Sequence, residues 1–228
     1  MISGLRGEII EGEVIVGRWN TVSEKRLVSC SALEILEKTC VASDYDTGEL
    51  DTGGTHKFYT MEASGWSNVI PVTEDGKLVL VKQFRIGLND YTLEFPGGKL
   101  DGNEKPVEAV IREMTEETGY TLTKEGTVKE LGWAFSNPAI LNNKCHSFVA
   151  GPVVKNQDQK LDNGEMVEIV EVAVEDLPDL ISEGKFRHAL MLNSLFWLLF
   201  ADQGIQALIV ARLLMKSKIT PNKSILAN

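Results

Sequence analysis

The sequence predicts an α+β protein in which a mixed sheet packs against helices and an antiparallel strand region precedes it. Segments with the alternating pattern of strands lie both before and after one long amphipathic helix, an order typical of this class. The chain has 228 residues, of which 43% are hydrophobic. That is enough to bury the core of one large domain and to carry an appendage.

Five strands are expected before the helix. Turn-forming glycines and aspartates separate the alternating segments, which predicts two antiparallel hairpins followed by one further strand that ends at Pro96. The strands are 34–42 with 56–62, 68–73 with 78–84, and 91–95. Residues 1–30 alternate weakly and are assigned to additional strands and loop.

The part of the chain after the helix is expected to return to strands and then to end in helices. The strands are predicted at 128–135, 146–154 and 166–174, and a short helix at 177–183. Polar residues interrupt the apolar tract 189–215, which favours two packed helices over a membrane span. We therefore expect an N-terminal strand region, a main domain and a helical tail: residues 1–65, 66–201 and 202–228.

The net charge and the cysteine content indicate which ligands the protein binds and in which cellular compartment it lies. The formal net charge is −10, so small phosphorylated ligands are expected rather than a nucleic acid. Three widely spaced cysteines and the lack of an apolar run at the start of the sequence predict a reducing, cytoplasmic location. The three histidines have no cysteine or histidine at zinc-ligand spacing, so a zinc site is not expected.

The helix at 106–118 concentrates carboxylates. Its apolar residues recur at helical spacing and predict one buried face, formed by Val107, Val110, Ile111 and Met114. Glu113, Glu116 and Glu117 share a neighbourhood on this helix and repel one another unless a cation intervenes. Mg²⁺ binds through a few carboxylates together with water and substrate phosphates. A solvated acidic helix face is the alternative.

A longer pattern surrounds these carboxylates. Gly98 is followed after five residues by Glu104, and after seven more by the segment REMTEETGY, residues 112–120. This pattern resembles the signature of the Nudix hydrolases at every fixed position. Two departures outside the metal chemistry are Tyr120, where the family usually has an aliphatic residue, and Lys105 at the helix N-cap, where Ser or Thr is common. The segment 73–104 resembles the subgroup that hydrolyses ADP-ribose and related nucleoside diphosphate sugars.

The resemblance implies a Nudix-type α/β/α sandwich that binds Mg²⁺, with Mn²⁺ as the alternative metal. The implied metal ligands are the carbonyl of Gly97 and the carboxylates of Glu113, Glu116 and Glu117. Arg112 is expected to orient the glutamates and, with Glu116, to take part in catalysis, and a plain surface ion pair is the alternative for Arg112. Glu104 is expected either to bind metal-bound water or to act as an anion at the helix N-terminus.

The resemblance also implies a catalytic base and substrate contacts. Glu165 follows Gly164 in a loop before a late strand and is the expected base, with Glu168 as the alternative. Arg85, Gly98 and Pro138 are expected to bind substrate. For Arg85, a structural salt bridge is the alternative.

Together these expectations describe a metal-dependent pyrophosphatase that cleaves a nucleoside diphosphate sugar, first of all ADP-ribose, to AMP and ribose 5-phosphate. Another Nudix substrate, such as GDP-mannose or a dinucleoside polyphosphate, is the alternative within the same class. A nucleotide-sugar sensor on a Nudix scaffold is the alternative from a different class. The resemblance further implies a homodimer formed through the N-terminal strands, with no nucleic acid or membrane as a partner.

Overall fold

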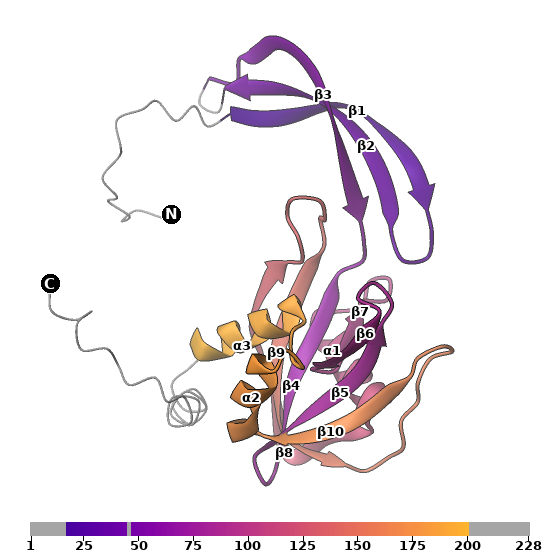
Figure 1. The fold of residues 1–228 in the computed structure, drawn as a ribbon, viewed down its shortest axis with the longest axis vertical. Helices are drawn as coiled ribbons and strands as arrows, with labels where there is room; N and C mark the ends of the chain where they lie inside the picture. The colour runs from indigo at the N-terminus through magenta and orange to yellow at the C-terminus, as the bar shows by residue number, and fades with distance from the viewer. Residues whose placement is uncertain (1–16, 45–46, 201–228) are drawn as a thin grey trace, which may run out of the picture. The chain divides into compact units, whose positions relative to one another are not determined.

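The computed structural model describes residues 17–44 and 47–200 of the chain (Figure 1). The chain forms two compact units, one that ends at Glu62 and one that begins at Ala63. Each unit has its own sheet, and the predicted α+β class with an N-terminal antiparallel sheet is confirmed. None of the described helices is long and apolar enough to cross a membrane.

The first unit is a three-stranded antiparallel sheet with β2 in the middle. Its strands are β1 (Gly17–Ser29), β2 (Glu34–Asp44) and β3 (Leu50–Glu62). The expected hairpin is confirmed, since Glu34 pairs with Glu62 and the register continues along both strands. Leu36 and Cys40 are buried on β2. Residues 1–16, which the sequence assigns together with 17–30, lie outside the described residues.

The second unit is built on a mixed sheet of seven strands. They are β4 (Trp66–Thr73), β5 (Lys77–Arg85), β6 (Asp90–Glu94), β7 (Gly97–Lys99), β8 (Tyr120–Phe135), β9 (Lys144–Lys155) and β10 (Val167–Ala173). The order is β10-β5-β4-β9-β8, with β6 beside β5 and β7 beside β4. β4 and β9 run parallel and the other pairs are antiparallel, which confirms a mixed sheet.

The structure differs from the predicted strands at two places. β8 begins at Tyr120 rather than near residue 128, because its pairing with β9 continues across two register shifts. The sequence does not predict β7, since glycines have low strand propensity, yet its backbone pairs with β4. The predicted hairpin of β4 and β5 is confirmed as an antiparallel pair, with Val72 registered against Leu78.

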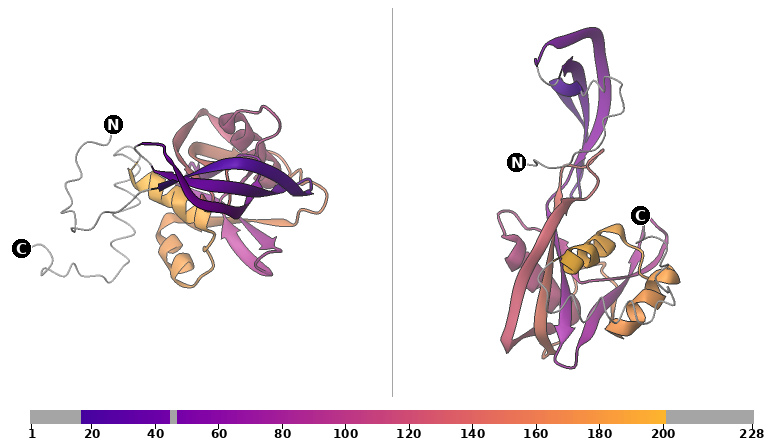
Figure 2. Two further views of the ribbon diagram at one scale, coloured as in Figure 1. Left: turned by 90° about the horizontal axis from the view of Figure 1, so that it is seen from above. Right: turned by 90° about the vertical axis from the view of Figure 1, so that its left-hand side faces the viewer.

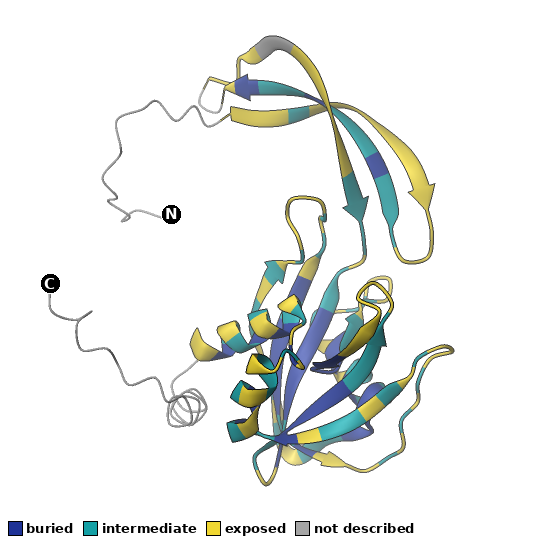
Figure 3. Cartoon of the chain, viewed as in Figure 1, coloured by how far each residue is buried: buried dark blue, intermediate teal, exposed yellow. Residues whose placement is uncertain are grey.

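Helices cover both faces of the seven-stranded sheet (Figure 2). One face carries α1 (Pro106–Thr118), and the other carries η1 (Val174–Asp176), α2 (Leu177–Ser182) and α3 (Ala189–Phe200). Successive residues of a strand point to opposite faces, so Val79 packs in the core with α1 and Leu80 in the core with α2 and α3. The strands between these helices are the buried centre in Figure 3. The second helix predicted within 189–215 lies outside the described residues.

The bounds of α1 agree with the sequence prediction. Pro106 occupies the start, where its missing N–H costs no hydrogen bond. Glu108 accepts a hydrogen bond of 3.1 Å from the backbone N–H of Lys105, which supplies part of the cap that the lysine side chain cannot. Gly119 ends the helix with φ of 69°, and a Cβ atom there would lie 2.1 Å from the carbonyl oxygen of Gln157.

The predicted buried face of α1 is wrong in part. Val107 and Ile111 are 37% and 38% exposed, whereas Val110 and Met114 are fully covered and Glu117 is buried with them. The buried face of α1 is rotated from the predicted apolar face toward the side that carries the glutamates, because α1 packs against β4 and β7 as well as β8. Hydrophobic spacing alone did not show this rotation, and the rotation is what buries a carboxylate.

Candidate active site

Glu117 is the most deeply buried carboxylate of α1. It is 4% exposed, and its Oε2 accepts a hydrogen bond of 2.9 Å from the backbone N–H of Gly97. Burial raises the pKa of Glu117 to about 8, and the charges of Glu113 and Glu165 add to the rise while the Gly97 hydrogen bond opposes it. At neutral pH this carboxyl group therefore favours either a proton or a bound cation.

Glu113 lies against the glycines of β7. A Cβ atom at Gly98 would lie 2.1 Å from Oε1 of Glu113, and one at Gly97 would lie 2.3 Å from the carbonyl oxygen of Ser67. Burial raises the pKa of Glu113, and Arg112 offsets part of the rise. Gly98 therefore makes room for the carboxylate of Glu113, while Gly97 allows β7 to lie close to β4.

Arg112 joins the helix to the segment before it. Its guanidinium donates to Glu104 at 3.0 and 2.9 Å, to Glu113 at 2.9 Å and to Glu116 at 3.1 Å. It also donates to the carbonyl oxygen of Lys99 at 3.2 Å. The structure thus gathers Arg112, Glu104, Glu113 and Glu116 in one network, and the hydrogen bonds to Glu104 lead the causes that raise the pKa of Arg112.

The donor set of α1 suits a hard divalent cation. Glu113, Glu116 and Glu117 offer carboxylate oxygens from one end of one helix, and burial raises the pKa values of Glu113 and Glu117. Within residues 17–44 and 47–200, no three His, Cys, Asp or Glu side chains converge on a single point as metal ligands do. Arg112 engages two of these glutamates instead. A cation bound here would compete with Arg112 for their oxygens.

The structure separates the two candidate bases. Glu165 lies just before β10, and its charge is among the causes that raise the pKa values of Glu113 and Glu117, so it lies near them. Its carboxylate accepts a hydrogen bond of 3.0 Å from the backbone N–H of Asp162. Glu168 lies on β10, where its side chain is 66% exposed and forms an ion pair with Lys82 at 2.9 Å. Proximity to the other carboxylates favours Glu165.

Gln159 anchors the loop that carries Glu165. Its side-chain amide donates to the carbonyl oxygen of Glu117 at 2.6 Å and to that of Val167 at 3.2 Å. The backbone N–H of Lys160 donates to the carbonyl oxygen of Glu116 at 2.8 Å. The loop is therefore bonded both to the end of α1 and to the start of β10. Sequence reasoning missed Gln159, because one glutamine in a polar loop carries no signal for this role.

Arg85 forms an ion pair with the buried Glu94. This is the structural salt bridge predicted from the sequence as the alternative to substrate binding. Its Nε and Nη2 donate to the two carboxylate oxygens of Glu94 at 2.7 and 2.6 Å, and the hydroxyl of Thr92 also donates to Glu94. Burial alone would raise the pKa of Glu94, but the bonds from Arg85 outweigh it and lower that pKa. Sequence reasoning missed Glu94, although a charged residue at an inward position of an apolar strand is a usable signal.

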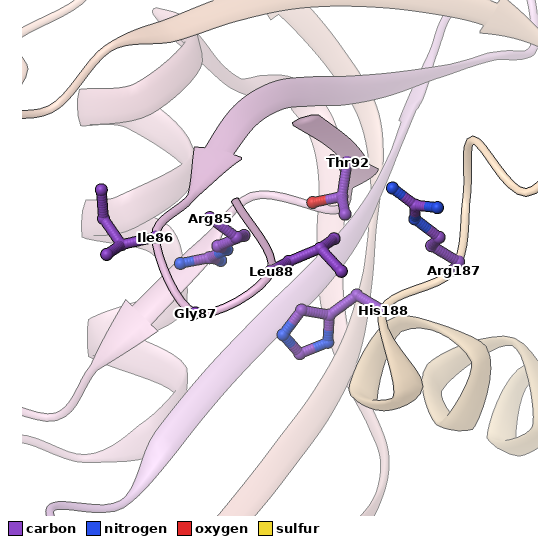
Figure 4. A pocket seen from close by; sticks show the side chains of 7 residues that line it. All are labelled: Arg85, Ile86, Gly87, Leu88, Thr92, Arg187 and His188. Carbon is purple, nitrogen blue, oxygen red and sulfur yellow. The ribbon is translucent and has the colours of Figure 1, made fainter. Parts of the chain in front are cut away.

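A pocket of about 420 Å³ lies beside this ion pair (Figure 4). The described residues that line it come from the β5–β6 hairpin and from the segment between α2 and α3: Arg85, Ile86, Gly87, Leu88, Thr92, Arg187 and His188. The ring of Trp66 lies 5.7 Å from the ring of His188 and 5.9 Å from the guanidinium carbon of Arg85. Arg85 is also within the influence of the charges of Glu117 and Glu165, so the pocket adjoins the carboxylates.

Two residues singled out by sequence lie away from this cluster. Pro138 is exposed in the turn between β8 and β9, and that turn hydrogen-bonds through Asn142 and Asn143 to the backbone of Ala63 and Ser64. Within the described residues, no contact joins Pro138 to the glutamates, and its substrate role stays a prediction. Tyr120 is buried, and its hydroxyl donates to Glu171.

Comparison with protein families assigns a domain to the second unit. The family model described as the NUDIX domain matches residues 65–195. A solved structure titled "Crystal structure of ADP compounds hydrolase" superposes with a TM-score of 0.65 over 79% of this chain and 92% of that chain. Its sequence identity is 19%, so this likeness concerns the fold.

Several relatives are similar over most of their own length. ADP-ribose pyrophosphatase of Bacillus subtilis (strain 168) is 35% identical over 134 residues, which span 58% of this chain and 71% of the relative. ADP-sugar pyrophosphatase of Mus musculus is 31% identical over 169 residues, spanning 68% and 74%. The methanol dehydrogenase activator of Bacillus methanolicus is 30% identical over 154 residues, spanning 66% and 80%.

Proposed function

The chain belongs to the Nudix family and is a Nudix pyrophosphatase, and we propose that it hydrolyses ADP-ribose or a closely related ADP-sugar with the help of a divalent metal. From ADP-ribose the products are AMP and ribose 5-phosphate. The observation that carries the proposal is the pair of carboxylates on α1, the partly buried Glu113 and the buried Glu117, held against the glycines of β7. The relatives named for ADP-ribose and ADP-sugars support the choice of substrate class.

The metal in this proposal is Mg²⁺, with Mn²⁺ as the alternative. Glu113, Glu116, Glu117 and the carbonyl of Gly97 would hold it, and Arg112 would orient the glutamates. When bound, the metal neutralises phosphate charge and lowers the pKa of the attacking water. Without it, the carboxylates of α1 would repel a diphosphate, which is why hydrolysis should depend on metal.

The protein's own side chains then position the substrate and move the proton. Glu165 accepts the proton of the attacking water as general base. Glu168 is less suited because its carboxylate is held in an ion pair with Lys82. Arg85 contacts a phosphate through Nη1, the nitrogen that its hydrogen bonds to Glu94 leave available. Gly98 keeps the space beside Glu113 clear.

A panel of nucleotides with Mg²⁺, and with EDTA as the metal-free control, tests this function. ADP-ribose should release AMP in a metal-dependent reaction and should be the preferred substrate. Faster hydrolysis of GDP-mannose or of a dinucleoside polyphosphate would assign a different Nudix substrate. Tight binding of ADP-ribose without turnover would indicate a sensor on a Nudix scaffold.

A further inference from the structure

The pocket beside Arg85 presents hydrogen-bond donors without a carboxylate. Arg85, Arg187 and His188 supply its charged or titratable side chains, and none of the described residues that line it is acidic. Figure 4 shows these three side chains and Thr92 on different sides of the pocket. Such a lining is unexpected by chance in a chain with a formal net charge of −10.

Contacts outside the pocket hold the donors in place. Arg85 uses Nε and Nη2 for Glu94, and Arg187 uses Nη2 for Asp90. Each guanidinium keeps further N–H groups beyond those bonds. Nδ1 of His188 accepts a hydrogen bond of 3.2 Å from the backbone N–H of Leu190. That bond assigns the proton of the neutral ring to Nε2, which makes His188 a third donor.

The size and the apolar part of the pocket suit a small sugar phosphate. About 420 Å³ falls in the range of small-molecule pockets. Guanidinium groups match phosphoryl oxygens in charge and geometry. Ile86 and Leu88 are 83% and 48% exposed, and they offer apolar surface for the carbon atoms of a sugar ring.

We propose that this pocket is the subsite for the sugar-phosphate half of the substrate, with the phosphoryl oxygens held by Arg85, Arg187 and His188. The inference rests on the proposed function, in which ribose 5-phosphate is a product of ADP-ribose cleavage and Arg85 contacts a phosphate. It adds Arg187 and His188 as residues that determine specificity for the non-nucleotide half.

Binding of ribose 5-phosphate to the metal-free protein tests the subsite without turnover. In EDTA the glutamates of α1 repel phosphate, so calorimetry reports the pocket. Arg187→Ala and His188→Ala should each weaken binding at least about tenfold, since each removes a hydrogen-bond donor from the pocket. Lys185→Ala is the matched control, because Lys185 pairs with Glu183 and does not line the pocket.

Three outcomes would overturn the subsite. These are no binding of ribose 5-phosphate, equal binding by wild type and both variants, or binding of inorganic phosphate or AMP as tight as that of ribose 5-phosphate. Failure of the proposed function looks different, because ADP-ribose would then resist hydrolysis whatever the pocket binds. Normal hydrolysis of ADP-ribose together with unchanged binding of ribose 5-phosphate in both variants would contradict the subsite and leave the proposed function intact.

Discussion

At the scale of residues, neighbouring glutamates of α1 have different surroundings. Glu116 has a side chain that is 41% exposed and pairs with Arg112 at 3.1 Å. Glu117 is turned roughly 100° further around the helix, where it meets the backbone of β7 and is 4% exposed. One carboxylate therefore lies partly exposed beside a guanidinium, while the other is buried and favours a proton until a cation replaces it.

The Glu117→Gln substitution should lower turnover without lowering the stability of the metal-free protein. Glutamine resembles the protonated carboxyl group that a pKa of about 8 predicts for the metal-free protein at pH 7. The thermal midpoint without metal should therefore hold or rise. Mg²⁺-dependent turnover should fall at least about a hundredfold, as loss of one strong electrostatic element does.

Glu108→Gln is the matched control for that variant. Glu108 lies in the first turn of the same helix and accepts from the N–H of Lys105, a bond that glutamine can also accept. Its turnover should stay within a few-fold of wild type. Full activity of Glu117→Gln in Mg²⁺ would remove Glu117 from the metal site.

The Arg85–Glu94 pair predicts a pH dependence of stability. The pKa of Glu94 lies below its usual 4.5 in the folded protein, so the unfolded chain binds a proton at a higher pH than the folded one. The stability from this pair is present above about pH 4.5 and is lost as pH falls through the folded pKa. Urea unfolding between pH 3 and 7 should therefore show a smaller loss of unfolding free energy on acidification in Glu94→Gln than in wild type.

Glu94→Gln should also lower stability at pH 7 by roughly 3–5 kcal/mol, because it leaves the guanidinium of Arg85 partly buried without a counter-charge. Glu183→Gln is a suitable control, since it removes an exposed carboxylate paired to Lys185. Parallel pH profiles of Glu94→Gln and wild type would contradict the assignment.

At the scale of elements, α1, β7 and the loop before β10 act as one assembly. Gly98 makes room for Glu113 of α1, and the backbone N–H of Gly97 donates to Glu117. The end of α1 accepts hydrogen bonds from Gln159 and Lys160 of the loop. The position of Glu165 therefore depends on backbone bonds from two elements rather than on the loop alone.

Gln159→Leu should act through Glu165. Leucine keeps much of the volume but removes both side-chain hydrogen bonds, so the loop loses its attachment to β10 and keeps the backbone bond of Lys160 to α1. We expect kcat to fall about tenfold or more while KM changes little. Glu165→Gln should lower kcat by about a hundred- to ten-thousandfold, the usual share of a general base.

A double variant with Gln159→Leu and Glu165→Gln shows whether Gln159 positions Glu165 or whether its loss causes a general packing defect. If Gln159 serves to place Glu165, the double variant should be no slower than Glu165→Gln, because the group being placed is already gone. Multiplied losses would show that Gln159 acts elsewhere. Should Glu165→Gln turn over normally while Glu168→Gln is inactive, the base is Glu168.

At the scale of the whole molecule, the candidate site lies in the second unit and the first unit offers an exposed aromatic surface. Trp19 and Phe58 are 49% and 37% exposed, and their rings lie 4.9 Å apart. Exposed apolar groups of this kind mark interaction surfaces. We therefore retain the proposal that the first unit forms a homodimer interface.

Light scattering at micromolar concentration should give twice the mass of the chain. Phe58→Ser should shift the protein toward monomer by removing apolar contact area, whereas Val154→Ser, an exposed position of the second unit, should not. A monomeric wild type would contradict the proposal.

The sequence by itself determined the features that depend on near neighbours. Pro106, Gly119 and the helical spacing between them are enough to predict the bounds of α1, because caps and helical turns act within a few residues. The same locality makes the run of carboxylates visible as a motif. Alternation likewise predicted that strands exist, although it left the start of β8 and the existence of β7 undecided.

Only the tertiary structure decided the features that depend on residues distant in sequence. Packing on β7 and β4 turned α1 so that Glu117 is buried and Val107 and Ile111 are not. The fold also brought Gln159 to the end of α1, and it brought His188 to the pocket beside Arg85. No local pattern encodes these contacts, since each arises when separate elements pack around a shared core.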